Sequence, residues 1–242
     1  PWRIGPDSGE RDRVEAVLHS DALYSAVSVS MARLGLLEEW LRATFEDPEG
    51  PPVRFSSCFP FLRDARFVVP PNGLWPPPPS LKIRWKGARL VPLGVVEDLI
   101  AERPLREAAW RVDGWSRCLV PSDWPTGPFR PVIRSNAAVD RVDGSLATHN
   151  TACLEFAPEA GMWAVAAFAG AEAKDKWAEP VRACLRLLAD SGLGGERSRG
   201  WGRSLQPQFE EGEFPELVLP PVAPRDSEDG TQGATEVAHW LL

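Results

Sequence analysis

The chain has 242 residues, of which 43% are hydrophobic and 25% charged, and a formal net charge of −7. These values are ordinary for a soluble globular protein, and the length allows one large or two small domains with an ample core. No apolar run approaches the ~18 residues of a membrane span and no signal-peptide pattern opens the chain, so nothing predicts a membrane helix or export.

Two helices are predicted near the start of the chain. Apolar residues recur at helical spacing over residues 23–34, with Ser20 or Asp21 as a plausible N-cap and Gly35 as a natural stop. A second, short helix is predicted over residues 36–45, because a proline- and glycine-rich turn follows it.

The next segment predicts short strands. Residues 81–90 alternate between basic and apolar side chains, which predicts a half-buried strand with a basic outer face. Two interpretations of this basic face stay open: it lies in solvent at a sheet edge, or it contacts RNA. The other elements expected here are strands over 53–57 and 65–69 and a helix over 95–101.

The second half mixes strands and helices. Residues 103–130 carry three tryptophans and several prolines with little periodicity, which indicates an irregular insertion. Residues 150–156 and 162–169 predict a strand pair, and a helix follows with Pro180 in its first turn and Gly192 just past its end. Further strands are expected near 209–218 and over 237–242. Such units, without long parallel runs, indicate an α+β fold with ferredoxin-like modules.

The segment that follows this helix is the most unusual of the chain. We call residues 192–203 the glycine-rich loop; its notable residues are Gly192, Gly194, Gly195, Arg197, Ser198, Arg199, Gly200, Trp201, Gly202 and Arg203. Glycine lets backbone N–H groups turn towards a ligand, and arginine adds forked donors that match phosphate. Trp201 offers a flat face for a base. The loop therefore predicts an anionic ligand, with nucleic acid favoured; the alternative is a flexible surface loop.

Two nucleotide-binding motifs are excluded. Gly195 and Gly200 have the spacing of a P-loop, but Trp201 stands where that motif needs lysine. The dinucleotide fingerprint fails as well, because Arg197 stands where it needs its third glycine. No cofactor is therefore predicted.

The charge is unevenly distributed. Residues 206–242 hold eight acidic residues and one arginine, so this segment carries the whole net charge of −7 and residues 1–205 are neutral. Basic side chains can therefore cluster on one face while the acidic segment points elsewhere.

Catalytic and metal-binding patterns are weak. The histidines are His19, His149 and His239, and His19 at a helix start is best explained by capping or packing. Neither a nucleophile elbow, nor paired aspartates for two-metal chemistry, nor zinc-ligand spacing occurs. The cysteines form no C-x-x-C pair, and we expect them to be reduced, buried thiols of a cytoplasmic protein: Cys58, Cys118, Cys153 and Cys184.

Several segments, in order, resemble the RAMP proteins of CRISPR systems, and most of all the fourth-subunit family of type III-A (Csm) effector complexes. Residues 3–5, 19–26 and 55–61 read Arg-Ile-Gly, His-Ser-Asp-Ala-Leu-Tyr-Ser-Ala and Phe-Ser-Ser-Cys-Phe-Pro-Phe. Residues 134–141 and the glycine-rich loop continue the resemblance, which spans nearly the whole chain.

The resemblance implies two ferredoxin-like (RRM-related) RAMP modules, over residues 1–130 and 131–242, and no catalytic role. Members of this family cap the 5′ repeat-derived handle of CRISPR RNA and bridge the large polymerase-palm subunit to a backbone RAMP subunit. A thumb hairpin distorts the guide–target RNA duplex near the cap, and residues 103–130 are its candidate here. Family chains start earlier and continue further, so we expect a trimmed chain.

The expected RNA-binding residues combine the loop with more distant positions. Backbone N–H groups of the loop, with Arg197, Arg199 and Arg203, would hold handle phosphates, and Trp201 would stack on a base or pack. The other expected residues are Arg134, Asn136 and Arg141 in the same groove and His19 and Ser20 near its opposite wall. Two alternatives stay open: a RAMP-family endoribonuclease that processes CRISPR repeat RNA, and a protein-interaction subunit whose loop only packs.

Overall fold

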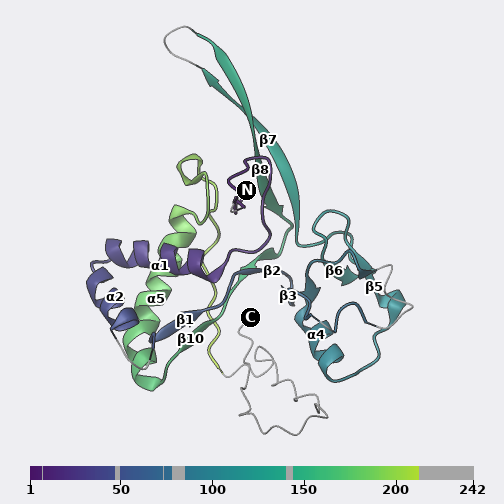
Figure 1. Cartoon of the computed structure of the whole chain (residues 1–242), viewed down its shortest axis with the longest axis horizontal. Coiled ribbons are helices and arrows are strands. Elements are labelled where there is room, and N and C mark those ends of the chain that lie inside the picture. Colours follow the sequence, from purple (N-terminus) through teal and green to yellow (C-terminus); the bar gives the residue numbers. More distant parts are fainter. Residues whose placement is uncertain (7, 47–49, 73, 78–84, 140–143, 213–242) are drawn as a thin grey trace, which may run out of the picture. The chain divides into compact units, whose positions relative to one another are not determined.

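A computed structural model describes residues 1–6, 8–46, 50–72, 74–77, 85–139 and 144–212, and residues 1–209 form one compact unit (Figure 1). Its α-helices are α1 (Ser20–Arg33), α2 (Leu37–Phe45), α4 (Leu93–Ile100) and α5 (Ala171–Ser191). Its strands are β1 (Val53–Phe55), β2 (Phe59–Leu62), β3 (Ala65–Val68), β4 (Val91–Pro92), β5 (Trp110–Val112), β6 (Leu119–Pro121), β7 (Phe129–Val139), β8 (Leu146–Phe156), β9 (Ala160–Trp163) and β10 (Ala166–Phe168). The architecture is α+β, as the sequence predicts.

The strands form small antiparallel sheets that join distant parts of the chain. The largest has the order β4-β3-β2-β9, so β9, from late in the chain, pairs with β2 from early in it. Strand β10 pairs with β1 in the same way. Because both pairings cross residue 130, the division into modules over 1–130 and 131–242 stays a prediction.

Helices α1, α2 and α5 pack around one tryptophan. Trp40 of α2 is fully buried; its ring lies 5.1 Å from that of Trp177 on α5 and 5.7 Å from that of Tyr24 on α1. Its indole N–H donates to the Ser28 hydroxyl at 3.0 Å, so the buried donor is satisfied. Because Tyr24 and Trp177 lie in the first halves of α1 and α5, this cluster packs the N-terminal parts of the two helices together.

The helices near the start of the chain are confirmed, whereas the boundaries of α5 correct the prediction. Pro180 lies in the interior of α5, because the helix begins at Ala171. A proline inside a helix removes one backbone hydrogen bond. Here the helix continues through it because burial of one face, which includes Trp177, Val181 and Cys184, outweighs that loss.

Several strand predictions are corrected. Residues 150–156 pair with β7, not with the strand that follows them. In the expected strand over 81–90, residues 81–84 lie outside the described residues, and Lys86 and Gly87 form a turn. Residues 209–212 are not a strand, and the rest of 209–218, like 237–242, lies outside the described residues.

Strands β7 and β8 form a long hairpin in unbroken register, from Phe129 opposite Phe156 to Val139 opposite Leu146. Phe129 is buried at its base, whereas Ile133 and Leu146 are 59% and 64% exposed further out. The segment 103–130 is less irregular than predicted, because β5 and β6 pair within it and Leu119 and Val120 of β6 are fully buried. No helix among the described residues is long and apolar enough to cross a bilayer.

Candidate RNA-binding site

The glycine-rich loop is folded against the first residues of the chain. The Gly195 N–H donates to the Arg3 carbonyl at 2.8 Å, and the Gly202 N–H donates to the Pro1 carbonyl at 3.0 Å. The Trp2 indole N–H donates to the Arg203 carbonyl at 3.2 Å. These three bonds, spread along the loop, define its shape.

Three of the glycines, including Gly192, are required by close backbone approach. At Gly194 (φ +90°) a Cβ atom would lie 2.3 Å from the Arg3 carbonyl oxygen, and at Gly202 (φ +80°) one would lie 2.1 Å from the Leu193 carbonyl oxygen. A side chain at any of the three positions would meet backbone that cannot easily move, in addition to a disfavoured φ. The glycine content therefore serves packing as well as ligand access.

Arg3 anchors the N-terminal segment on which the loop rests. Its side chain is 9% exposed, and its guanidinium donates to the carbonyls of Glu10, Arg11, Arg13 and Ala152 at 2.9–3.1 Å. Ala152 belongs to β8, which the backbone of Trp2 also pairs with. The N-terminal residues thus lie between the loop and the base of the β7–β8 hairpin and join the two. This role of Arg3 was not predicted, because an arginine whose partners among the described residues are backbone carbonyls leaves no pattern in a sequence.

The loop's arginines are exposed, but they differ in their partners. Arg197 and Arg199 lie on a short 3-10 helix, Arg197–Arg199. Arg199 forms an ion pair with Glu196 at 3.2 Å, whereas Arg197 and Arg203 have no charged partner in the described part of the chain. Arg197 and Arg203 are therefore the loop arginines most available to a phosphate.

The backbone of the loop is only partly available, which corrects one expectation. Donors already used inside the protein are the N–H groups of Gly192, Leu193, Gly195, Arg199, Gly200, Trp201 and Gly202. Within the described residues, the N–H groups of Gly194, Glu196, Arg197, Ser198 and Arg203 have no such bond. Trp201 is 7% exposed, so it packs in the core and presents no face for base stacking.

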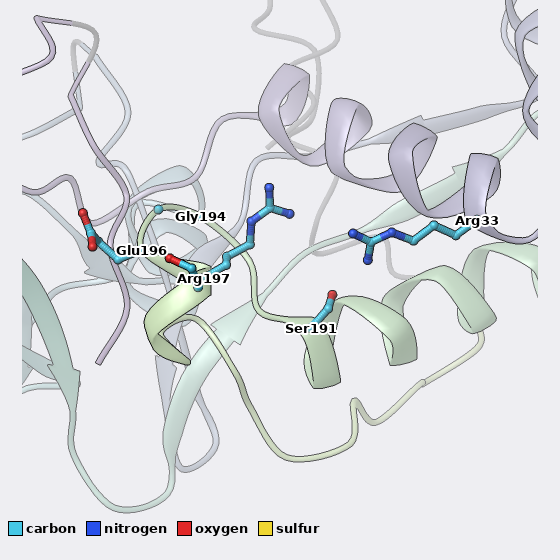
Figure 2. A pocket seen from close by; sticks show the side chains of 7 residues that line it. Arg33, Ser191, Gly194, Glu196 and Arg197 are labelled. Carbon is cyan, nitrogen blue, oxygen red and sulfur yellow. The ribbon is translucent and has the colours of Figure 1, made fainter.

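An open pocket of about 610 Å³ lies beside the loop, where α1 and α5 end (Figure 2). Its lining residues are Arg33, Ser191, Gly194, Gly195, Glu196, Arg197 and Ser198. The Ser191 hydroxyl is buried and has no hydrogen-bond partner among the described residues. Neither Arg33 nor Ser191 was predicted as a site residue. Arg33 lies in the last turn of α1, a helix that the sequence predicts. Its proximity to the loop could not be predicted from the sequence.

Arg134 and Asn136 lie on β7, where a carboxylate already holds the arginine. Arg134 donates to the Glu155 carboxylate at 2.6 Å, and Arg130 donates to the same group at 2.9 Å. These hydrogen bonds lower the pKa of Glu155 and raise that of Arg134. A phosphate at Arg134 would have to compete with Glu155. Arg141 lies outside the described residues.

His19 and Ser20 lie at the far end of α1 from the pocket. His19 is the N-cap and Ser20 the first residue of the helix, whereas Arg33, its last residue, lines the pocket. At 1.5 Å per residue the separation is about 20 Å. His19 and Ser20 therefore do not line this pocket, and their place across a groove from the loop stays a prediction.

A metal site needs several acidic, histidine or cysteine side chains close together. Across the described ranges, no three His, Cys, Asp or Glu side chains lie close enough to hold a metal ion. All four cysteines are free and buried, as expected, and burial raises the pKa of Cys58 and Cys118 to about 12.

Comparison with known proteins is informative at the level of structure. No family model and no curated protein matches the chain by sequence. Its fold is similar to that of a chain in the Csm3–Csm4 subcomplex of the type III-A CRISPR-Cas interference complex, with a TM-score of 0.51, 13% identity and 74% of this chain covered. The chain covers 61% of that protein's length.

Weaker similarities involve other complexes of the same kind. A chain of the Csm1–Csm4 cassette in complex with cA4 has a TM-score of 0.48 and 18% identity over 72% of this chain and 60% of that one. A chain of the type III-B Cmr-beta complex bound to cognate target RNA has a TM-score of 0.39 and 10% identity, with coverage of 77% and 43%. The similarity to the Csm3–Csm4 chain concerns the fold, and it agrees with the α+β architecture expected from the sequence.

Proposed function

We propose that this chain is a non-catalytic, RNA-binding subunit of a type III CRISPR effector complex, and that it caps the 5′ repeat-derived handle of the CRISPR RNA. The observation that carries the proposal is the exposed Arg197 on a loop held rigid by the N-terminal residues, next to an open pocket. An arginine with no acidic partner on such a scaffold is suited to a backbone phosphate. The fold shared with a chain of the Csm3–Csm4 subcomplex supports the assignment to this type of complex.

The RNA-contacting set that we propose is smaller than the sequence predicts. It keeps Arg197, Arg199 and Arg203, with the loop N–H groups that have no internal partner. Arg134 and Asn136 belong to it as a second group on β7, conditional on displacement of Glu155 from Arg134. Trp201, His19 and Ser20 are left out on grounds of burial and distance.

The partners follow from the same proposal. A backbone RAMP subunit, the counterpart of Csm3, would contact this chain on one side, and the large polymerase-palm subunit on the other. We place the thumb that contacts the guide–target RNA duplex in the β7–β8 hairpin instead of residues 103–130. The outer part of that hairpin is exposed, whereas the β5–β6 pair within 103–130 contributes buried residues to the core.

The proposal is tested by coexpression with the other subunits of a type III complex, followed by sequencing of the RNA that copurifies. The expected result is intact CRISPR RNA that begins with the repeat-derived handle, lost when this chain is omitted. A repeat-containing RNA incubated with the purified chain should stay uncut. Cleavage abolished by His19→Ala would contradict the proposal and establish the endoribonuclease alternative.

A further inference from the structure

The pocket beside the glycine-rich loop brings together two arginines from distant parts of the chain. Arg33 comes from the end of α1 and Arg197 from the loop, and both line the pocket. Figure 2 shows the two guanidinium groups extending towards one another, while the Glu196 side chain points away from Arg33. Neither arginine forms an ion pair with a described residue, and the acid on the rim, Glu196, is paired with Arg199.

Two unpaired guanidinium groups around one cavity repel each other unless an anion lies between them. The ends of α1 and α5 place partial negative charge nearby, but much of it is already neutralised. At α1, N–H groups of residues 34–36 bond the last carbonyls, and at α5 the Gly192 N–H bonds the Leu188 carbonyl. Two full charges on flexible side chains therefore dominate the electrostatics of the pocket.

Other groups of the pocket also suit an oxyanion. The N–H groups of Gly194 and Ser198 have no backbone acceptor within the described ranges. The Ser191 hydroxyl in the pocket wall is buried without a partner among the described residues, which is uncommon in folded proteins. The two non-bridging oxygens of a backbone phosphate can accept from several of these donors together, and an arginine fork matches their geometry.

We infer that the Arg33–Arg197 pocket binds one backbone phosphate of the RNA. Arg33 then contacts the same RNA strand as the loop arginines, and it does so without regard to base sequence. This inference rests on the proposed function, because it names a further contact of the same RNA. It adds α1 to the RNA-binding surface at the end opposite to His19 and Ser20.

The test measures equilibrium binding of a short fluorescent single-stranded RNA with the handle sequence to the full chain at several salt concentrations. Arg33→Gln should weaken binding about tenfold and make the slope of log K against log salt less steep by ~0.7, the loss of one phosphate contact. Arg33→Lys should retain part of the affinity. The control is Arg42→Gln, which removes another exposed arginine, one on α2 that pairs with Glu46, and should change neither quantity beyond a small general effect.

Three outcomes separate the inference from the proposed function. If Arg33→Gln behaves like Arg42→Gln while Arg197→Ala/Arg199→Ala weakens binding, the pocket inference is overturned and the proposed function stands. If none of the variants changes RNA binding, the proposed function itself fails. If Arg33→Gln spares RNA binding but prevents copurification of another subunit, the pocket takes an acidic protein surface, and the inference is again overturned.

A second experiment identifies which phosphate of the RNA Arg33 contacts. RNAs that carry one neutral methylphosphonate at successive positions are compared on the wild-type chain and Arg33→Gln. One position should weaken binding to the wild-type chain and have no further effect on the variant, because the contact is already lost there. Equal losses for both proteins at every position would overturn the inference.

Discussion

The backbone N–H of Gly195 donates to the carbonyl of Arg3 at 2.8 Å, so the glycine-rich loop and the N-terminal segment are built on one another. The Arg3 guanidinium in turn bonds the Ala152 carbonyl of β8. Two elements that the sequence separates by about 190 residues thus form one rigid unit.

Gly194→Ala should destabilise the protein by about 3 kcal/mol. About 1 kcal/mol comes from the left-handed backbone, and about 2 kcal/mol from the clash with the Arg3 carbonyl. The matched control is Gly200→Ala, which has a similar φ of +78° but nothing within 4 Å of the added Cβ. Urea unfolding of the two variants measures the difference, and equal losses would show that the loop does not rest on Arg3.

Arg3→Met should cost about 3 kcal/mol of unfolding free energy, because it leaves several carbonyls, including the buried Ala152 carbonyl, without their donor. Arg13→Met serves as the control: its side chain is 72% exposed and pairs with Glu10, so the expected loss is within about 0.5 kcal/mol. Chemical denaturation compares the two. A loss at Arg3 no larger than that at Arg13 would contradict the anchoring role.

Trp201→Ala should lower stability by about 3 kcal/mol, because the ring is buried. Trp201→Leu, which keeps an apolar side chain but has no aromatic face, should bind the handle RNA as the wild-type chain does. Thermal melts and RNA titrations well below the melting temperature separate the two effects. A folded Trp201→Leu variant with greatly weakened RNA binding would restore the stacking role that the burial of this residue argues against.

The Glu155 carboxylate gives a pH-dependent prediction. Its pKa in the folded protein lies below the ordinary value because Arg134 and Arg130 donate to it. Its contribution to stability is therefore complete above the ordinary carboxyl pKa and is lost as the pH falls through the lowered one. Unfolding free energies of the wild-type chain and Glu155→Gln, measured over an acid pH series, should differ at neutral pH and converge in acid.

The same substitution tests the role of Arg134 in RNA binding. Glu155→Gln removes the competing carboxylate and should strengthen binding of the handle RNA if Arg134 contacts a phosphate. The gain should vanish in the double variant Arg134→Gln/Glu155→Gln. A gain that persists in the double variant would mean that Glu155 acts only through general repulsion of the RNA.

The sequence predicts local features of this fold better than its long-range pairings. The helix at residues 20–33 follows from apolar spacing around Leu23, Val27 and Met31, which needs no knowledge of the rest of the chain. The partner of β8 could not be predicted, because β7 and β9 flank it at similar sequence distance and alternation alone does not choose between them. The predicted start of α5 is too late, because Pro180 is expected in its first turn. The local cost of a proline inside a helix is outweighed here by burial of Trp177 and Val181.

In the candidate site, too, local features could be predicted from the sequence better than long-range contacts. Residues of the glycine-rich loop could be named from composition, since glycine and arginine carry recognisable chemistry. Arg33 and Ser191 could not, because they enter the pocket only through the packing of α1 against α5. Trp201 was ambiguous in sequence, because an aromatic ring beside glycine is equally compatible with stacking and with burial.

The most direct test of the central claim is the affinity of the assembled complex for a labelled 5′-handle RNA, compared between wild type and Arg197→Ala/Arg199→Ala. The control is Arg42→Ala/Arg106→Ala, which removes the same charge at exposed positions outside the loop. The account predicts at least about a tenfold loss for the loop variant, with the RNA uncut. Affinity equal to that of the control would mean that the loop only packs against the N-terminal residues and does not hold the RNA.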